Sequence, residues 1–136
     1  MSNVEQTLSI IKPDAVERNL IDDIKSIFIK NNLKIKEDKK IQITKEEAAE
    51  FYKVHQSKPF YDDLCAYLSS GPINVMILEG KNAVLSNRNL MGATDPKNAE
   101  ENTIRKLYGI SIDKNSVHGS DSVENAQVEI NFFFKN

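Results

Sequence analysis

The residues best suited to chemistry lie together near the C-terminus, in a stretch from Asn115 to Ser122 that reads NSVHGSDS. It places His118, one of two histidines in the chain, directly before Gly119 and ahead of two hydroxyls and a carboxylate. A neutral imidazole is a competent nucleophile near pH 7. A helix is predicted to begin just after the stretch, and free N–H groups at a helix N-terminus suit a phosphate. The pattern therefore indicates phosphoryl transfer.

Two side chains could orient the His118 ring. Glu129 lies on the predicted helix that follows, where it could hold one ring nitrogen and leave the other free to attack. Ser120 could orient the ring, or it could cap the helix. The alternatives are a half-buried histidine satisfied by its neighbours and a solvated surface glutamate, and both stay open at this point.

Three cations are candidates for binding phosphate. Lys12 follows the first predicted strand, Arg88 lies on a predicted helix, and Arg105 lies in a long irregular segment. A phosphoryl-transfer site needs several such donors, because the charge on the transferred group has to be offset. Taken singly, each cation is typical of a solvated surface charge. Their convergence is a hypothesis for the fold to test.

The sequence lacks the other common nucleotide motifs. It has no GxxxxGK(S/T) loop, no GxGxxG loop and no set of protein-kinase motifs. His55 and His118 do not have metal-ligand spacing and there is no cysteine cluster, so no structural zinc is expected. Side chains must therefore supply most of any phosphate site.

Composition narrows the class of protein. The 136 residues, 40% hydrophobic and 28% charged, suit one globular domain over residues 1–136. The net charge of −2 argues against a protein that coats nucleic acid. Cys65 is the only cysteine, so a reducing compartment is expected. The chain begins with no signal-peptide pattern and has no apolar run long enough to span a bilayer, so we expect a cytoplasmic protein without a membrane partner.

Hydrophobic periodicity predicts the elements that would position these residues. Strands are expected at residues 7–11, 33–43, 73–78 and 117–118. Helices are expected from residue 20 to near 31–32, from 44–47 onward, and at 60–68, 83–91 and 123–134. Residues 92–114 have a weak pattern, which favours a functional loop that begins with Gly92 as a helix C-cap. The order of elements indicates an α+β sandwich with an antiparallel sheet and helices on one face.

The NSVHGSDS stretch also resembles the signature of nucleoside diphosphate kinases. Further segments resemble that family in the same order, and together they cover essentially the whole chain. They are IKPDAV (11–16), KPFY (58–61), SGP (70–72), LEG (78–80), NAV (82–84), MGATDP (91–96) and TIR (103–105). The chain is similar to the shorter, bacterial members of the family.

The resemblance implies a ferredoxin-like fold, with helices packed on a four-stranded antiparallel sheet. It also implies transfer of the γ-phosphate of a nucleoside triphosphate, typically ATP, to a nucleoside diphosphate by a ping-pong mechanism, which maintains NTP and dNTP pools. His118 would carry the phosphate on the ring nitrogen nearer the backbone, with Glu129 on the other nitrogen and Ser120 hydrogen-bonded to Glu129. The positions that match the family's phosphate- and sugar-binding residues are Lys12, Tyr52, Arg88, Thr94, Arg105 and Asn115.

The same resemblance covers the base, the metal and the assembly. Phe60 would stack on the base, with Ile112 opposite and Leu64 nearby, although core packing would otherwise explain Phe60 and Leu64. Mg²⁺ would arrive with the nucleotide, bound through its phosphates and not by protein ligands. No specific nucleic acid is expected as a partner, and the chain would form a homo-oligomer, either a tetramer or a hexamer.

Some positions depart from the family's pattern. Asn19, Asp22 and Asn102 stand where the family usually has glycine. Asparagine enters left-handed conformations more easily than most residues, whereas Asp22 could alter the start of the first helix. Lys106 and Leu107 replace a small residue and an aspartate, which affects loop rigidity and subunit contacts but no matched catalytic position.

Two other functions are compatible with parts of the sequence. A non-catalytic nucleotide- or DNA-binding protein on the same fold is the main alternative, and conversion of GDP to GTP separates it from a kinase. A hydrolase using Ser120 with His118 is a second alternative, although the chain has no GxSxG elbow.

Overall fold

A four-stranded antiparallel sheet forms the centre of the protein. The computed structural model describes residues 4–53, 56–111 and 114–134. Within them the strands are β1 (Val4–Ile11), β2 (Lys34–Ile41), β3 (Ile73–Lys81) and β4 (Val117–Gly119), in the order β2-β3-β1-β4. All three pairings are antiparallel, so the predicted sheet is confirmed. The short β4 lies at one edge beside β1, and there Ile10 pairs with His118.

The long helices lie close to where the hydrophobic pattern predicts them. The helices are α1 (Pro13–Glu17), α2 (Ile21–Lys30), α3 (Lys45–Phe51), α4 (Tyr61–Leu68), α5 (Ala83–Met91), α6 (Ile104–Tyr108) and α7 (Val123–Phe133), with a 3₁₀ helix at Pro96–Asn98. A capping box formed by Thr44 and Glu47 opens α3, where a helix is predicted to begin. Both α1 and α6 were not predicted, because five residues are too few to show a helical period.

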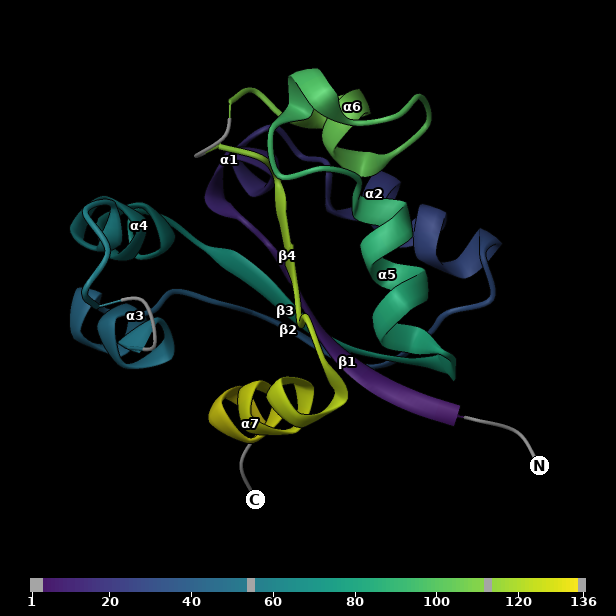
Figure 1. Cartoon of the computed structure of the whole chain (residues 1–136), viewed down its shortest axis with the longest axis horizontal. Coiled ribbons are helices and arrows are strands. Elements are labelled where there is room, and N and C mark those ends of the chain that lie inside the picture. The colour runs from purple at the N-terminus through teal and green to yellow at the C-terminus, as the bar shows by residue number, and fades with distance from the viewer. Residues whose placement is uncertain (1–3, 54–55, 112–113, 135–136) are drawn as a thin grey trace.

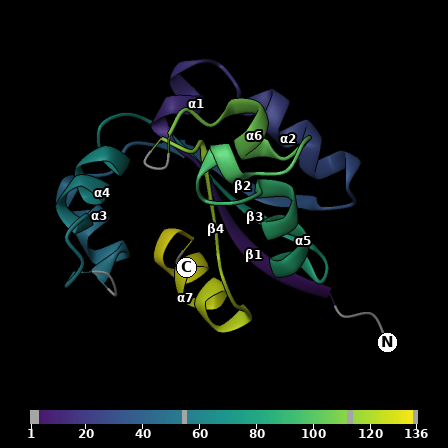
Figure 2. The same cartoon turned by 45° about the horizontal axis from the view of Figure 1, so that its top comes forward.

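Helices cover both faces of the sheet, which corrects the expectation of helices on one face (Figures 1 and 2). Leu8, Ile10 and Val75 pack in one core with residues of α3, α4 and α7. Ile11 and Met76 pack in a second core with residues of α1, α2, α5 and α6. Alternate side chains of a strand point to opposite faces, so the unbroken apolar run of β3 is the signature of this double burial.

The departures from glycine fall at positions that tolerate them. Asn19 and Asn102 adopt φ values of 62° and 69°, the left-handed region expected of them. Asp22 lies in the first turn of α2, where a carboxylate suits the positive end of the helix dipole. Lys106 and Leu107 both belong to α6. Among the described residues, no helix has the length and apolar character needed to cross a membrane.

Candidate active site

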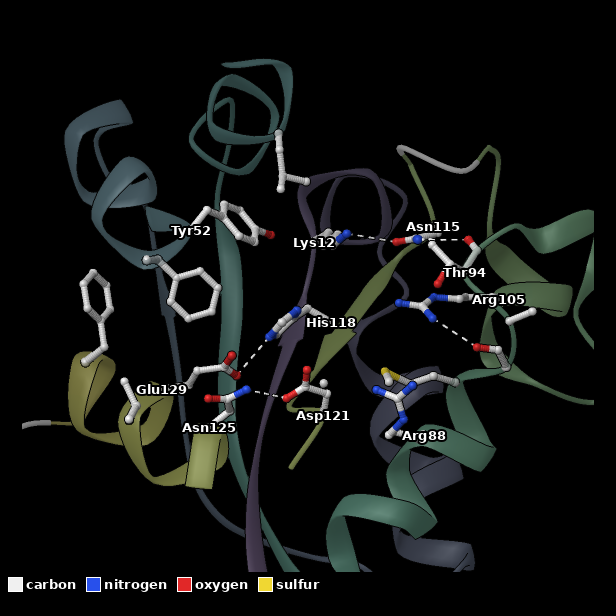
Figure 3. Close-up of a pocket in the computed structure, with 18 of the residues that line it drawn as sticks. Lys12, Tyr52, Arg88, Thr94, Arg105, Asn115, His118, Asp121, Asn125 and Glu129 are labelled. Atoms are coloured by element: carbon white, nitrogen blue, oxygen red, sulfur yellow. Dashed lines mark hydrogen bonds and ion pairs between the residues drawn. The ribbon is translucent and has the colours of Figure 1, made fainter. Parts of the chain in front are cut away.

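One large pocket gathers most of the predicted site residues. Its volume is about 1030 Å³, and its walls come from β4, α3, α4, α5, α6 and α7, from Lys12 directly after β1 and from the segment after α5 (Figure 3). The predicted residues that line it are Lys12, Tyr52, Phe60, Leu64, Arg88, Thr94, Arg105, Asn115, His118 and Glu129. Ser120 lies behind the wall, and Ile112 falls outside the described residues. The convergence of the three cations, which the sequence left open, is present in the fold.

His118 is held at one ring nitrogen by a carboxylate. Its Nε2 lies 3.0 Å from Oε1 of Glu129, and the Ser120 hydroxyl donates to the same oxygen at 2.7 Å. Because a carboxylate only accepts hydrogen bonds, we assign the ring proton to Nε2. The lone pair then resides on Nδ1, the nitrogen nearer the backbone. In the close-up, the ring lies at the centre of the pocket, between Glu129 and the cations (Figure 3).

Ser120 has a supporting place behind this pair. Its side chain is fully buried, and its hydroxyl oxygen accepts a hydrogen bond from the Leu8 amide at 3.3 Å. The hydroxyl proton is directed to Glu129. A hydroxyl with both roles occupied and no surface in the pocket is badly placed to attack a substrate, so the geometry does not favour a serine hydrolase.

An aromatic wall stands beside the histidine, and the sequence pattern predicted Tyr52 but missed Phe51. Phe51 packs edge-on against the His118 ring, with centroids 5.4 Å apart, and also contacts Phe132 and Phe133 of α7. The ring centroid of Tyr52 lies 6.5 Å from that of His118. From sequence, Phe51 belonged only to the apolar side of a helix, and no motif distinguished it from core. These rings flank the imidazole edge-on and limit the space in which it can rotate.

Lys12, Asn115 and Thr94 form a hydrogen-bonded chain at the other end of the pocket. The Lys12 ammonium donates to Oδ1 of Asn115 at 2.9 Å, and the Asn115 amide donates to the Thr94 carbonyl at 3.0 Å (Figure 3). Lys12 and Asn115 are buried. An ammonium carries three donors, so Lys12 can contact an anion while it holds Asn115. The segment before α6 is thus tied to the end of β1.

Arg105 is fixed by the backbone and faces a second arginine. Its guanidinium donates to the carbonyls of Gly92 at 3.0 Å and Val117 at 2.9 Å. Burial, and after it the nearby charge of Arg88, lowers the pKa of Arg105 from 12.5 to about 10. Without an anion, the two guanidinium groups repel each other. The pocket therefore favours a ligand with several negative charges.

Gly119 brings Arg88 and His118 to the same pocket. A Cβ at this position would overlap Nδ2 of Asn87 and would lie 2.9 Å from Sδ of Met91. Both of those side chains are buried on α5. Glycine thus allows α5 to pack closely against β4, and the helix that carries Arg88 reaches the strand that carries His118.

The N-terminus of α7 contributes fewer phosphate-binding groups to the pocket than the sequence suggested. The Ser122 hydroxyl caps the helix by accepting from the Asn125 amide at 3.1 Å. Asp121 and Asn125, which also line the pocket, hydrogen-bond to each other at 2.6 Å. In the part of the chain that the structure describes, no group of three or more His, Cys, Asp or Glu side chains is arranged to hold a metal ion. The donors facing the pocket are mainly cationic side chains.

The arrangement has the parts that phosphoryl transfer requires. A ring nitrogen with a free lone pair faces an open pocket, a carboxylate holds the opposite nitrogen, and fixed cations stand where charge would have to be offset. The fold and the pocket together fit the class of phosphotransferases that use a histidine nucleophile.

Comparison with known proteins specifies the family. The family model described as Nucleoside diphosphate kinase matches residues 5–136. The nucleoside diphosphate kinase of a Nitratiruptor species is 59% identical over 96% of both chains, and that of Campylobacter lari is 57% identical over 96% of both chains. The chain belongs to the nucleoside diphosphate kinase family, and it is a kinase by these relatives.

Solved structures agree with this assignment. A crystal form of the Aquifex aeolicus nucleoside diphosphate kinase has a TM-score of 0.96 and 42% identity, covering 98% of this chain and 96% of that one. A nucleoside diphosphate kinase of Halobacterium salinarum, solved in complex with CDP, has a TM-score of 0.93 and 40% identity, covering 97% and 88%. The ferredoxin-like fold expected from the sequence is confirmed.

Proposed function

We propose that the protein transfers the γ-phosphate of a nucleoside triphosphate, typically ATP, to a nucleoside diphosphate by a ping-pong mechanism through a phosphohistidine on His118. The reaction would maintain NTP and dNTP pools. The observation that carries the proposal is the 3.0 Å contact between His118 Nε2 and Glu129, which leaves Nδ1 as the nucleophile. The family assignment supports the reaction type.

In the first half-reaction, the Nδ1 lone pair attacks the γ-phosphorus. A P–N bond forms, the bond from the γ-phosphorus to the bridging oxygen breaks, and its electron pair leaves with the nucleoside diphosphate. Positive charge develops on the ring, and Glu129 offsets it through the hydrogen bond to Nε2. In the second half-reaction, a terminal phosphate oxygen of another nucleoside diphosphate attacks the phosphohistidine and regenerates the imidazole. A phosphoryl group on imidazole nitrogen is a high-energy species, so both steps can be nearly balanced.

The remaining pocket residues would bind the nucleotide. Lys12, Arg88 and Arg105 would offset phosphate charge, and Tyr52, Thr94 and Asn115 would contact the phosphates and the sugar. The charge of Arg88 lowers the pKa of Arg105, so this pair of guanidinium groups favours an anionic ligand. The CDP complex of the Halobacterium salinarum relative supports a nucleotide in this pocket.

Phe60 would stack on the base, with Leu64 nearby. Phe60 is 47% exposed and lines the pocket. Its ring is therefore poorly packed in the core and is accessible to a planar base. Leu64 is half-buried and also packs on the core behind it. Stacking reads no base edge, so this contact would accept all common bases. Ile112, the predicted second face of the stack, lies outside the described residues.

Mg²⁺ would enter with the nucleotide. The pocket's cations suit phosphate oxygens, and the described residues offer no cluster of metal ligands, so a metal held by the phosphates themselves fits this wall. When bound, Mg²⁺ would neutralise phosphate charge and fix the conformation of the triphosphate.

The test is covalent labelling. The protein is mixed with γ-labelled ATP and Mg²⁺, and we expect one labelled histidine whose phosphate is lost in acid and kept in base. His118→Asn should abolish the label while retaining the fold. If His118→Asn still took up acid-labile phosphate, the assignment of the nucleophile would be wrong.

Turnover separates the kinase from its alternatives. The protein at catalytic concentration should convert GDP to GTP with ATP as donor, which a non-catalytic nucleotide or DNA binder would not do. Parallel lines at several ATP concentrations in a double-reciprocal plot are expected of a ping-pong reaction. The homo-oligomer, tetramer or hexamer, stays a prediction that light scattering tests, and a cytoplasmic location stays a prediction as well.

A further inference from the structure

A strained turn stands directly before the catalytic strand. Ser116 has a φ of 75°, and the Val117 amide donates to the Asn115 carbonyl across it at 2.9 Å. These features define a γ-turn of the rare positive-φ kind. Serine has a Cβ and enters this region only when its surroundings hold it there. The turn matters because Asn115 precedes it and His118 follows it by two residues.

Hydrogen bonds to the segment after β1 hold the turn, and the longest of them runs from the Arg18 guanidinium to the Ser116 hydroxyl oxygen at 3.4 Å. The Ser116 hydroxyl donates to Oδ2 of Asp14 at 2.9 Å. The Ser116 carbonyl accepts from the Lys12 amide at 2.8 Å. Ser116 is fully buried and Asp14 is 6% exposed, so water does not compete for these groups. The turn and the Lys12 backbone are therefore fixed relative to each other.

Asp14 connects this turn to two further elements. The Tyr67 hydroxyl, on α4, donates to its Oδ1, and burial together with this hydrogen bond raises the pKa of Tyr67. The Arg18 guanidinium lies 3.1 Å from Oδ2 of Asp14 and also donates to the Tyr108 carbonyl at 2.6 Å. Tyr108 ends α6, the helix that carries Arg105. Asp14, itself on α1, thus joins the turn to α4 directly and to α6 through Arg18.

The hydrogen-bonded network around Asp14 does not itself line the pocket, although residues next to it in the chain do. Asp14, Arg18, Tyr67 and Ser116 are absent from the pocket wall, whereas Lys12 and Asn115 meet there at 2.9 Å (Figure 3). Any effect of the network on the reaction must pass through the elements that it holds, which are those two side chains, β4 and, through Tyr108, the helix that carries Arg105.

We propose that Asp14 and Ser116 are positioning residues, which hold the γ-turn so that the Asn115 amide and the Lys12 ammonium meet at the phosphate end of the pocket. This inference rests on the proposed function, because it assigns that end of the pocket to phosphate. The hydroxyl of Ser116 is the decisive group. This hydroxyl anchors the turn to Asp14. Without that hydrogen bond, the backbone at residue 116 would relax away from its strained φ.

Two substitutions at Ser116 separate anchoring from backbone strain. Ser116→Ala removes the hydroxyl and keeps the steric cost of φ 75°, so the turn should relax and displace Asn115. We expect the rate of His118 phosphorylation at saturating ATP to fall about tenfold, which is the size of one lost buried hydrogen bond. Ser116→Gly also removes the hydroxyl but accepts positive φ without strain, so its loss should be smaller than that of alanine.

Asp14→Ala tests the other end of the same hydrogen bond. If Asp14 acts through Ser116, the double variant Asp14→Ala/Ser116→Ala should be no slower than Asp14→Ala alone. Asp14→Asn keeps an oxygen acceptor for the Ser116 hydroxyl and should recover most of the rate. If Asp14→Ala fails to fold, the two Ser116 variants decide the question alone.

Ser9→Ala is the matched control for losing a buried hydroxyl. Ser9 is fully buried on β1, and its hydroxyl has no hydrogen-bond partner among the described residues. The Ser9→Ala variant should phosphorylate His118 at the wild-type rate. Every variant is scored by its melting temperature, by single-turnover phosphorylation and by GTP formation from GDP.

The outcomes distinguish positioning from a purely structural role. If Ser116→Ala and Ser116→Gly melt at lower temperature but react at the wild-type rate, Asp14 and Ser116 only stabilise the fold and the inference is overturned. If the wild-type protein forms GTP without a labelled histidine, the proposed phosphohistidine is wrong. The rate of GTP formation by the Ser116 variants then still decides whether the turn positions the site.

Discussion

His118 obtains its reactivity from its partners. Nothing in the imidazole itself chooses which nitrogen attacks, and the choice follows from Glu129, which accepts from Nε2. The Ser120 hydroxyl donates to the Glu129 carboxylate and holds it in place, and the Leu8 amide holds that hydroxyl by donating to its oxygen. The nucleophile is therefore oriented by a chain of hydrogen bonds that ends on the backbone of β1.

The charge of Glu129 should matter more than its hydrogen bond. In Glu129→Gln the amide oxygen can still accept from Nε2, but no negative charge offsets the cationic ring that forms during transfer. We expect His118 phosphorylation to slow by about 100-fold, with ADP affinity changed less than about twofold. Single-turnover labelling measures the first quantity and calorimetry the second. Glu124→Gln, on the exposed first turn of the same helix, should leave both unchanged, and an equal effect of the two variants would contradict the role.

Arg88 should favour ligand binding at the expense of stability. Its charge lies near enough to buried Arg105 to lower the pKa of that group, so the free protein carries an unfavourable interaction. Arg88→Gln should raise the free energy of unfolding by about 0.5 kcal/mol and weaken ADP binding about tenfold. Lys106→Gln removes the same charge from an exposed position on α6 and should do neither. Weaker binding without added stability would show that the repulsion is negligible.

At the scale of elements, the end of α5 sets the position of α6. Gly92 ends α5 with a φ of 85°, and its carbonyl accepts from Arg105. A Cβ here would lie 2.5 Å from Oγ1 of Thr103, the hydroxyl that caps α6. One residue thus joins the conformation of the helix end, the cap of the next helix and the guanidinium in the pocket.

Gly92→Ala should therefore destabilise the protein by about 2 kcal/mol, because it combines unfavourable φ with a steric clash. Urea unfolding at 25 °C measures this loss. Gly71→Ala is the control, since its Cβ would meet only Cβ of Pro13 at an ordinary 3.6 Å, and its effect should stay below about 0.5 kcal/mol. Nucleotide affinity should fall in Gly92→Ala alone, as Arg105 loses its carbonyl partner. Similar losses at both glycines would contradict the argument.

The elements that sequence predicted are those with enough residues to show a period. The long helices and the central strands satisfy that condition, and the capping box at Thr44 marks one start directly. The five-residue α1 and α6 do not, and the weak pattern of residues 92–114 conceals α6. The unbroken apolar run of β3 did indicate burial on both faces, which the expectation of one helical face overlooked.

The candidate site was predictable only where a motif named its residues. His118, Glu129 and the cations matched family positions, and the fold brings them to one pocket. Phe51 and Asp14 were not predicted, because an apolar residue on a helix and an aspartate after a strand have no distinctive spacing. Their contacts with His118 and Ser116 connect residues far apart in the chain, and one sequence contains no signal for such pairs.

On the scale of the whole molecule, the sheet separates two cores, and the pocket draws on both. One core contains residues of α3, α4 and α7, and the other contains residues of α1, α2, α5 and α6. Tyr52 belongs to the first core and also lines the pocket, so its burial depends on the packing of the whole protein. A pH high enough to ionise the Tyr52 phenol should therefore lower the free energy of unfolding of the whole protein.

Alkaline pH should unfold the protein partly through Tyr52. Burial, and then the charge of Glu129, raises the pKa of Tyr52 above its ordinary value of 10. Above pH 10 the unfolded chain releases this proton and the native protein keeps it. The stabilisation is therefore complete below pH 10 and is lost as the pH rises beyond it, by up to about 1.4 kcal/mol per pH unit. Tyr52→Phe should lessen the slope of unfolding free energy between pH 10 and 11.5, as measured by urea titration. The shifted pKa values of Tyr67 and Arg105 also contribute to the slope in this range, but both groups are common to the two proteins and their contributions cancel. Equal slopes would therefore show that Tyr52 ionises freely in the native state.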